Sequence, residues 1–469
     1  MACACLSVSD PWRSVRFHSA LLRSAGTLPT SSDFGVALIN APASAPGQLC
    51  AANDAIDRTL RPLRIALLGY RSAPFSGGQG VYLKYLSRAL AKQGHQVTVI
   101  SGPPYPELDD AIPLERLPSL DLYTHGLRSV TLPTLATDRL ARIEWLSKLT
   151  GGFVEPWTFG ERARDALLVR RGDFDIVHDN QTLSDGILDL QRAGFPLVTT
   201  IHHPITRDRR LALAAEPRWH YRLLIKRWHS FLAMQGRVAR ALDHIITVSG
   251  ASRQDIISDF GVNPSRVQVL HNGVDAQLFS PQPEIARKPC QIMATASADT
   301  PTKGLHILLA AAAKLRASYS GLGLTLIGRP KPGGDTERLV RELGLEAQVR
   351  WIKDADHGAI VRLYAESTLA VVPSLYEGFG LPAVEAMACG VPLVSSDGGA
   401  LAEVVGNGGV VVPAGDIEAL TRALDSLLGD QGARDELGRA ARARVEAHFS
   451  WDVCAQRLSE YYRQRVLTC

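Results

Sequence analysis

"LRIALLG", residues 63–69, is an apolar run apart from Arg64 near its start, and it is followed by the glycine turn "SGGQG" (76–80), by "VYLKYLSRALAKQGH" (81–95) and by "QVTVI" (96–100). A continuous apolar run predicts a strand buried on both faces of a sheet. Apolar residues recur at helical spacing in 81–95, so the order is strand, glycine turn, helix, strand. Strands that alternate with helices indicate a parallel sheet covered on both faces, and right-handed crossovers make it doubly wound.

The same order continues along the chain in two series. The first adds the predicted strands 174–178, 196–201 and 243–249, with helical segments between them. The second begins after the Pro-rich stretch "FSPQPEIARKPC" (279–290) and contains the apolar runs "QIMATA", "LGLTLIG", "VRWI", "LAVVPS", "VPLVSS" and "GGVVV". We therefore expect an α/β protein with two doubly wound, Rossmann-like parallel-sheet domains.

The expected domains are residues 62–270 and 271–449, with the hinge between about 265 and 285, around "VLHNGVDAQLF". Residues 450–469 are expected to form an amphipathic helix that packs back toward the first domain. Ligands of open α/β sheets bind at the carboxyl ends of the strands. Two such sheets in tandem therefore predict a cleft between them as the functional site.

Bulk composition excludes several classes of protein. Of 469 residues, 46% are hydrophobic and 21% charged, which is typical of a folded globular chain. The net charge of +4 gives no basic tail or stripe for nucleic acid. Seven cysteines without a C-x-x-C pair favour neither a disulfide framework nor a zinc site, and suit a reducing compartment. No apolar run reaches the ~20 residues of a membrane span, so we expect a cytoplasmic protein.

Residues 1–61 differ from the rest of the chain. They are rich in Ala, Ser and Arg and poor in acids, which is a pattern of organelle transit peptides. A disordered extension explains the same composition, and Asp10 together with a weak amphipathic pattern favours that alternative. Organelle targeting by this segment stays open.

Two glutamates flank a glycine turn in "SLYEGFGLPAVEAMACG" (374–390). Gly378 and Gly380 interrupt any helix that could hold both, and Pro382 suits the first turn of a new helix. Glu377 therefore lies in the loop after a strand, and Glu385 lies near the start of the following helix. Backbone amides at a helix start can bind phosphate, and carboxylates can accept from sugar hydroxyls. A first-turn acid that merely stabilises its helix would explain Glu385, but not Glu377 or the glycines.

The stretch "VVPSLYEGFGLPAVEAMACGVPLVSS" (371–396) resembles the signature of retaining glycosyltransferases of the GT-B fold, family-four type, also called glycosyl transferases group 1. The motifs "SGGQGVYLKYLSRALAKQGHQVTVISG", "VSGASRQDI", "VLHNGVDAQLF", "TKGLHILLAA" and "GGALAEVV" follow the order of the family. The resemblance covers roughly residues 62 to 450, which makes it far more specific than one motif. It implies GT-B architecture, a nucleotide-sugar donor on the second domain and an acceptor on the first.

The resemblance also implies roles for individual residues. Glu385 takes the position that holds the ribose hydroxyls, and Glu377 the position that contacts the transferred sugar. The amides around Phe379, Gly380 and Leu381 take positions close to that sugar and to the diphosphate. Lys303 matches the lysine that steadies the departing diphosphate, where negative charge builds as the glycosidic bond breaks.

Three further sets of residues complete the predicted site. His202 matches the Thr-x-His histidine near the reaction centre, with Thr200 two residues before it. Gly77 and Gly78 match the glycine loop of the first domain, where small residues let the backbone approach donor or acceptor. No G-x-G-x-x-G follows 63–69, which argues against an NAD enzyme. We predict no metal, because the D-x-D triplets 173–175 and 354–356 are better explained as solvated acids.

One position departs from the family pattern. In "TASADTPTKG" (295–304), Ala298 stands where the family usually has an arginine, five residues before Lys303. A second cation on the diphosphate must then come from elsewhere. Arg329 at the end of the next predicted strand is the first candidate, and Lys331 is the second.

The segment 207–240 is basic, with aromatic residues interleaved. Such a helix can lie on an anionic membrane surface, and several family members use lipid acceptors. The alternative is an ordinary helix over the first sheet with solvated arginines.

The function that we predict is a metal-independent, retaining transfer of a sugar from a nucleoside-diphosphate sugar to a hydroxyl of a sugar, lipid or small-molecule acceptor. No cofactor beyond the donor substrate is expected. Two rivals stay open: a nucleotide-sugar binding protein that has lost catalysis, suggested by Ala298, and a nucleotide-sugar epimerase of the same architecture.

Overall fold

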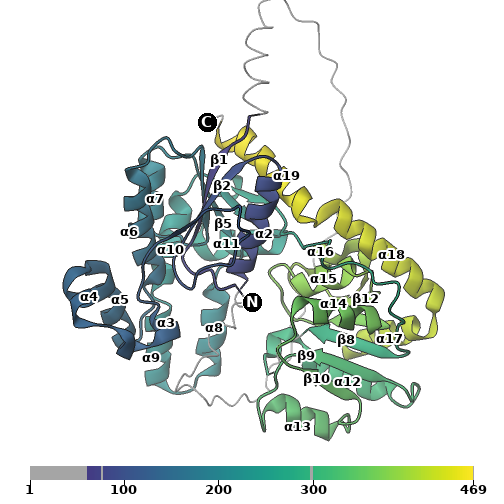
Figure 1. Ribbon diagram of the computed structural model, residues 1–469. Helices are drawn as coiled ribbons and strands as arrows, with labels where there is room; N and C mark the ends of the chain where they lie inside the picture. Colours follow the sequence, from purple (N-terminus) through teal and green to yellow (C-terminus); the bar gives the residue numbers. More distant parts are fainter. Residues whose placement is uncertain (1–60, 75–77, 296–298, 468–469) are drawn as a thin grey trace, which may run out of the picture.

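The computed structural model describes residues 61–74, 78–295 and 299–467, which fold into two lobes that lie side by side (Figure 1). Each lobe is built on one parallel sheet. The extension expected at the amino end, the loop residue Gly77 and the substituted position Ala298 lie outside the described residues.

The sheet of the first lobe has the order β3-β2-β1-β4-β5-β6-β7, and every pairing in it is parallel. The order reverses between β1 and β4, which is the doubly wound arrangement. Its strands are β1 (Arg64–Gly69), β2 (Gln96–Ser101), β3 (Leu114–Arg116), β4 (Ile176–Asn180), β5 (Leu197–Ile201), β6 (Ile245–Thr247) and β7 (Val267–Val269).

The sheet of the second lobe is also parallel throughout, with the order β10-β9-β8-β11-β12-β13. Both sheets confirm the prediction of two doubly wound α/β domains. Its strands are β8 (Gln291–Thr295), β9 (Gly323–Ile327), β10 (Val349–Ile352), β11 (Leu369–Val372), β12 (Leu393–Ser396) and β13 (Val410–Val412).

Helices cover both faces of each sheet. Those of the first lobe are α2 (Gln79–Lys92), α3 (Leu122–His125), α4 (Leu132–Thr137), α5 (Arg139–Leu149), α6 (Glu155–Leu168), α7 (Asp185–Arg192), α8 (Thr206–Ala215), α9 (Trp219–Trp228), α10 (Phe231–Ala241) and α11 (Gly250–Phe260). Those of the second lobe are α12 (Leu305–Leu315), α13 (Asp335–Glu342), α14 (His357–Glu366), α15 (Leu381–Ala388), α16 (Leu401–Val405), α17 (Ile417–Gly429) and α18 (Gln431–His448).

Two regions differ from the sequence-based expectation. The short edge strands β3 and β7 were not predicted, because each is only three residues long and includes polar residues, so neither contains an apolar run. The segment 207–240, expected as one helix, forms α8, α9 and α10 instead. The breaks come at Glu216 and at the His229–Ser230 pair, where the chain turns between helices.

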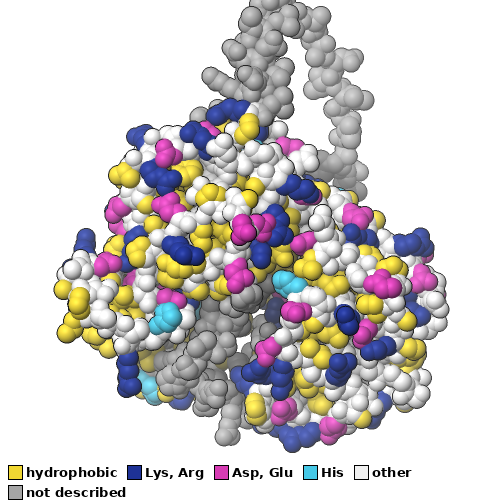
Figure 2. Space-filling view, in the orientation of Figure 1, with side chains coloured by type: hydrophobic (Ala, Val, Ile, Leu, Met, Phe, Trp, Pro, Cys, Tyr) yellow, Lys and Arg dark blue, Asp and Glu magenta, His cyan; other side chains and the backbone are white. Residues whose placement is uncertain are grey.

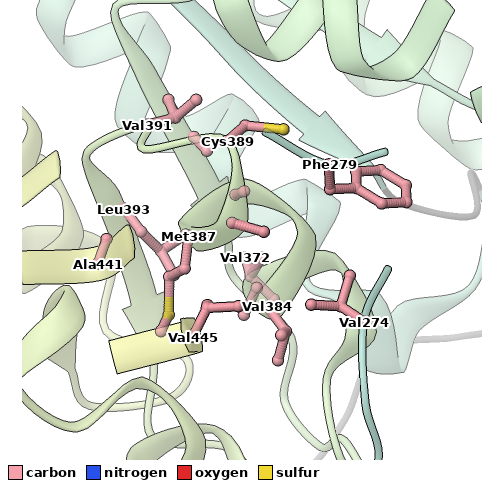
Figure 3. Close-up of a cluster of buried hydrophobic side chains, with 14 of the residues drawn as sticks. Val274, Phe279, Val372, Val384, Met387, Cys389, Val391, Leu393, Ala441 and Val445 are labelled. Carbon is pink, nitrogen blue, oxygen red and sulfur yellow. The ribbon is translucent and has the colours of Figure 1, made fainter. Parts of the chain in front are cut away.

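A buried apolar cluster holds α15 against its own lobe (Figure 3). Met387 and Val384 of α15 pack against Leu393 of β12 and against Ala441 and Val445 of α18. All five are at most 1% exposed. This packing holds the start of α15 in place, together with the loop before it, residues 377–381, which was predicted to bind the donor and is called the donor loop below.

The carboxyl-terminal segment crosses from the second lobe to the first, in yellow in Figure 1. Helix α19 (Trp451–Tyr461) packs on α2, and a single π-helical turn, η6 (Tyr462–Val466), ends it. The Tyr462 hydroxyl is fully buried and lies 2.5 Å from Nδ1 of His178 in β4. His178 in turn contacts Thr200 Oγ1 through Nε2, at 2.6 Å. This buried polar contact fixes the segment to the centre of the first sheet.

No helix in the described ranges is long and apolar enough to cross a bilayer. Basic and acidic side chains are interspersed over the face of both lobes shown in Figure 2, in keeping with the small net charge of +4.

Candidate active site

The carboxyl ends of the two sheets meet at the loop that follows β11. Ser249 Oγ and Ser252 Oγ, at the start of α11, donate to the carbonyl oxygen of Gly378 at 2.6 and 3.1 Å. A methyl group added to Gly378 would lie 3.6 Å from the His203 side chain. The predicted donor loop of the second lobe is thus in direct contact with the strand ends of the first.

Lys303 and Glu377 form an ion pair in this cleft. Lys303 Nζ donates to Glu377 Oε1 at 2.7 Å, and the same oxygen accepts from Ser374 Oγ at 2.8 Å. The side chains are 18% and 11% exposed respectively. The second carboxylate oxygen of Glu377 has no partner among the described residues. The pair therefore presents a cation and a free acceptor atom at one point.

Backbone geometry brings Lys303 to this place. The turn η4 (Pro301–Lys303) ends at Gly304, which has a φ of 66°. A Cβ on Gly304 would lie 1.8 Å from the carbonyl oxygen of Pro373, so only glycine lets the turn approach the end of β11 this closely. Leu375 N donates to Thr302 O at 2.8 Å and joins the two loops.

The start of α15 offers free backbone donors. Gly380 opens the helix with a φ of 94°, and a Cβ there would lie 2.6 Å from Leu401. The amides of Phe379, Gly380 and Leu381 donate to no described residue. Amides at a helix start attract anions, because their N–H groups have no partner within the helix. The predicted phosphate-facing amides are therefore available.

Glu385 lies one turn into α15 and, within the described residues, accepts no hydrogen bond. Burial raises its pKa from the ordinary 4.5 to about 7. Its charge also contributes, after burial and Asp275, to raising the pKa of Tyr85 on α2 of the first lobe. Glu385 thus faces the cleft as a carboxyl group without the partners that would favour its ionised form.

His202 directly follows β5 and therefore lies at the carboxyl end of the first sheet, the end that contacts the donor loop. Its Nε2 is 2.8 Å from Asn180 Oδ1, and its backbone N–H donates to Gln181 Oε1 at 2.8 Å. The edge of the imidazole meets the Tyr82 ring, with the centroids 4.7 Å apart. Burial, followed by the proximity of His203, lowers the pKa of His202 to about 3, so the ring is neutral.

The remaining predicted residues are placed differently. Arg329 follows β9, is exposed, and pairs with Asp354 at 2.5 Å, at the surface of the second lobe. No contact among the described residues places it beside Lys303, so its role as the second cation stays a prediction. Gly78 has a φ of 75° and precedes α2, and its neighbour Gly77 lies outside the described residues.

Several residues at the meeting of the lobes were missed in the sequence. Glu403 of α16 accepts from Gly250 N and pairs with His271 Nε2, both at 2.8 Å. Tyr376 donates its hydroxyl to Asp255 of α11. In sequence these are an ordinary helix acid and a loop aromatic, and only the approach of the first lobe gives them these partners.

The acids of the D-x-D triplets have structural contacts. Asp175 is not solvated as expected: its side chain is 8% exposed and pairs with Arg61 and Arg64. Asp356 caps α14 by accepting from Ala359 N at 2.7 Å. Among the described residues, no cluster of three or more His, Cys, Asp or Glu side chains forms a candidate metal site.

The segment proposed for membrane contact lies on the first lobe, and its first residue, Arg207, lies over the ring of Tyr376 at 3.7 Å. In α9 none of the ten described residues is buried, and Trp219 and Leu223 are 72% and 53% exposed. Beside it, between α5, α6 and α10, is an open groove of about 500 Å³ with Phe153 and Trp157 among its lining residues.

Comparison with known proteins covers almost all of the two lobes. Residues 279–444 match the family described as glycosyl transferases group 1, and residues 76–278 match glycosyltransferase family 4. The MMP alpha-(1->4)-mannosyltransferase of Mycolicibacterium hassiacum is 46% identical over 416 residues, which are 87% of this chain and 100% of that protein. A glycogen synthase of Mycobacterium tuberculosis is 29% identical, over 85% of this chain and 94% of its own length.

Solved structures share the two-lobed fold. Sucrose-phosphate synthase from Thermosynechococcus elongatus superimposes with a TM-score of 0.64 at 23% identity, over 87% of this chain and 100% of its own. The HepE protein of Anabaena, solved in complex with UDP and glucose, gives a TM-score of 0.60 at 19% identity, over 86% of this chain and 100% of its own.

Proposed function

This chain belongs to the glycosyl transferases group 1, and we propose that it transfers a mannosyl residue from a nucleoside-diphosphate donor to a hydroxyl of a saccharide acceptor. The new linkage is α-(1→4), the donor configuration is retained and no metal is needed. The relative with 46% identity, aligned over its full length, supports the sugar and the linkage.

The observation that carries the proposal is the Lys303–Glu377 pair beside the free amides of Phe379, Gly380 and Leu381. A sugar diphosphate has two parts that need opposite partners. Its phosphates need positive charge and N–H donors, and its sugar hydroxyls need acceptors. Within the second lobe this place offers both, a few ångströms apart, on a rigid helix start.

The reaction follows from these partners. The acceptor hydroxyl attacks the anomeric carbon on the face that the diphosphate leaves, the bond from that carbon to the phosphate oxygen breaks, and the proton passes to a phosphate oxygen. Negative charge grows on the diphosphate during this step. Lys303 and the amides at the start of α15 are aimed at that charge and stabilise the transition state more than the ground state.

Glu377 and Glu385 hold the two sugar rings of the donor in this account. Glu377 keeps one carboxylate oxygen free of described partners, and accepts from a hydroxyl of the transferred mannose. Glu385 accepts from the ribose hydroxyls, which supply the hydrogen bonds that it lacks in the described residues. His202 approaches the mannose from the first lobe.

Two rival functions make different predictions. A binding protein that has lost catalysis would bind the donor but not turn it over, with the alanine at 298 as the reason. An epimerase would convert the donor without any acceptor. The intact Lys303–Glu377 pair favours the transferase over both. In the transferase Lys303 stabilises the negative charge that grows on the departing diphosphate, and neither rival transfers the sugar to an acceptor.

Membrane contact through residues 207–240 is a separate proposal about where the protein acts. It rests on the exposed Trp219 and Leu223 of α9 beside the basic Arg222 and Lys226. Flotation with vesicles containing anionic lipid tests it: Trp219→Ser with Leu223→Ser should abolish co-flotation. Equal flotation of the variant, or none by the unaltered protein, would contradict it.

Donor turnover tests the main proposal. Release of nucleoside diphosphate from GDP-mannose, UDP-glucose and ADP-glucose would be measured with and without α-(1→4)-linked oligosaccharides, in the presence of EDTA. The expected result is acceptor-stimulated release from a mannosyl donor, lost in Glu385→Ala. Tight donor binding without release supports the binding protein, and conversion of the donor without acceptor supports the epimerase.

A further inference from the structure

Gln181 braces the backbone on both sides of His202. The residue follows β4 with a φ of 58°, a left-handed backbone conformation that residues other than glycine rarely adopt. Its Oε1 accepts from the N–H of His202, and its Nε2 donates to the carbonyl oxygen of His203, each at 2.8 Å. One side-chain amide therefore fixes the peptide units that carry the imidazole. An unfavourable backbone conformation persists only where its surroundings enforce it.

Asn180 holds the imidazole itself. Its Oδ1 lies 2.8 Å from His202 Nε2, and the residue is 1% exposed. Its Nδ2 is buried and has no partner among the described residues. An amide oxygen only accepts, so with the Asn180 side chain assigned in this orientation the proton of the ring belongs on Nε2. The Nδ1 atom then carries the lone pair, and no described residue donates to it.

The ring can keep this form because it stays neutral. Among the described residues no carboxylate contacts the ring: its neighbours are Asn180, the edge of Tyr82, and the rings of His178 and His203. Asp208 faces His203 at 3.8 Å, rather than His202. The tautomer of a neutral histidine is set by the hydrogen bond that its other nitrogen makes.

We propose that Asn180 and Gln181 are positioning residues that fix His202 as the Nε2–H tautomer in one orientation, so that Nδ1 accepts a hydrogen bond from a hydroxyl of the transferred sugar. This proposal rests on the proposed function for its substrate, but not for its geometry. It also explains why two side-chain amides follow one another at the end of β4: Asn180 contacts the His202 ring and Gln181 accepts from the His202 backbone N–H.

An ordinary structural role makes a different prediction. In that role Gln181 and Asn180 only stabilise the turn after β5. Gln191 has such a role at a different turn, between α10 and β6. Gln191 likewise bridges two backbone groups, donating to Ala241 O at 3.2 Å and accepting from Asp243 N at 3.0 Å. It lies far from the donor loop and serves as the matched control.

The test is the protonation state of the His202 ring in the full chain without substrate. Protein labelled with ¹⁵N-histidine gives distinct signals for protonated and unprotonated ring nitrogens, and the His202 signals are assigned by their loss in His202→Gln. We expect protonated Nε2 and unprotonated Nδ1 in the unaltered protein. Asn180→Leu, of similar shape, should give a mixture of tautomers, and Gln191→Met should change nothing.

Turnover of the mannosyl donor is the second readout. Asn180→Leu and Gln181→Met should each lower kcat about 10- to 100-fold, because a misplaced group near the reacting atoms costs that much. The KM of the donor should change less than threefold, and Gln191→Met should keep both constants. A Gln181→Met variant that folds provides the kinetic test if Asn180→Leu does not.

A ring protonated on Nδ1 in the unaltered protein would overturn the proposal. So would an Asn180→Leu variant that keeps both the single tautomer and full turnover. If the tautomer is as expected but no transferase activity exists with any donor, the positioning stands and the proposed function fails. The two failures are therefore distinguishable.

Discussion

Removing the Lys303 ammonium tests the leaving-group account most sharply. Lys303→Met keeps the length and apolar stem of the side chain and deletes only the charge. The ammonium lies 2.7 Å from Glu377 Oε1, with the two side chains 18% and 11% exposed. The change therefore removes both a cation at the diphosphate and the partner of a nearly buried carboxylate.

The two losses have different magnitudes and different readouts. Removing one preorganised group that stabilises developing charge costs about 10²- to 10³-fold in kcat, or roughly 2.7–4 kcal/mol. Removing one member of a fully buried ion pair costs about 3–5 kcal/mol of folding stability. Because both side chains of this pair keep some contact with water, and Ser374 still donates to Glu377, we expect about 1–3 kcal/mol.

Steady-state kinetics and urea unfolding measure both effects. Lys314→Met is the matched control, because Lys314 pairs with Glu418 at 2.5 Å in the same lobe, with both side chains at least 50% exposed. The control should keep its kcat and lose under 1 kcal/mol. A Lys303→Met enzyme whose kcat stays within threefold of the unaltered enzyme would refute the role of Lys303 in stabilising the leaving group.

Three further perturbations test other parts of the account. Folding raises the pKa of Glu385 from 4.5 to about 7, so between these pH values the folded state binds the proton more tightly and its stability falls as the pH rises. Glu385→Gln should remove this loss and raise the free energy of unfolding at pH 8 by about 2–3 kcal/mol, measured in urea. Donor affinity should fall in the same variant. Glu403→Ala removes acceptors for Gly250 N–H and His271 from the contact between the lobes, and should raise donor KM about tenfold with little change in kcat, measured by initial rates. Tyr462→Phe leaves His178 Nδ1 without its partner, and should cost about 1–3 kcal/mol in thermal or urea unfolding. Each idea fails if its variant matches the unaltered protein in the named measurement.

The sequence was sufficient for the elements that carry a long pattern. Both sheets follow from short apolar runs such as 65–68 that alternate with helical segments, which is the pattern of a parallel sheet covered on both faces. The loop between β11 and α15 was predictable because Gly378 and Gly380 disfavour helix and Pro382 suits the first turn of the helix that follows. The family signature then gave expected roles to Glu377, Glu385 and Lys303.

The sequence was insufficient where partners come from distant elements. Asn180 and Gln181 look like any polar residues after a strand, and their purpose appears only when β5 places His202 beside β4. Glu403 meets Gly250 and His271, and Ser249 meets Gly378, only through the approach of the two lobes. The edge strand β7 and the division of 207–240 into three helices depend on tertiary packing that overrides local preference.

The anomeric configuration of the product tests the central claim most directly. The chain would be incubated with a mannosyl nucleoside diphosphate, a 4-hydroxyl-bearing α-linked oligosaccharide and EDTA, and the new anomeric signal followed by proton NMR. A single new α-(1→4) mannosyl linkage, absent with Glu377→Gln, is the result that the account predicts. A β-linked product, a product formed only when a divalent metal is restored, or undiminished transfer by Glu377→Gln would contradict it.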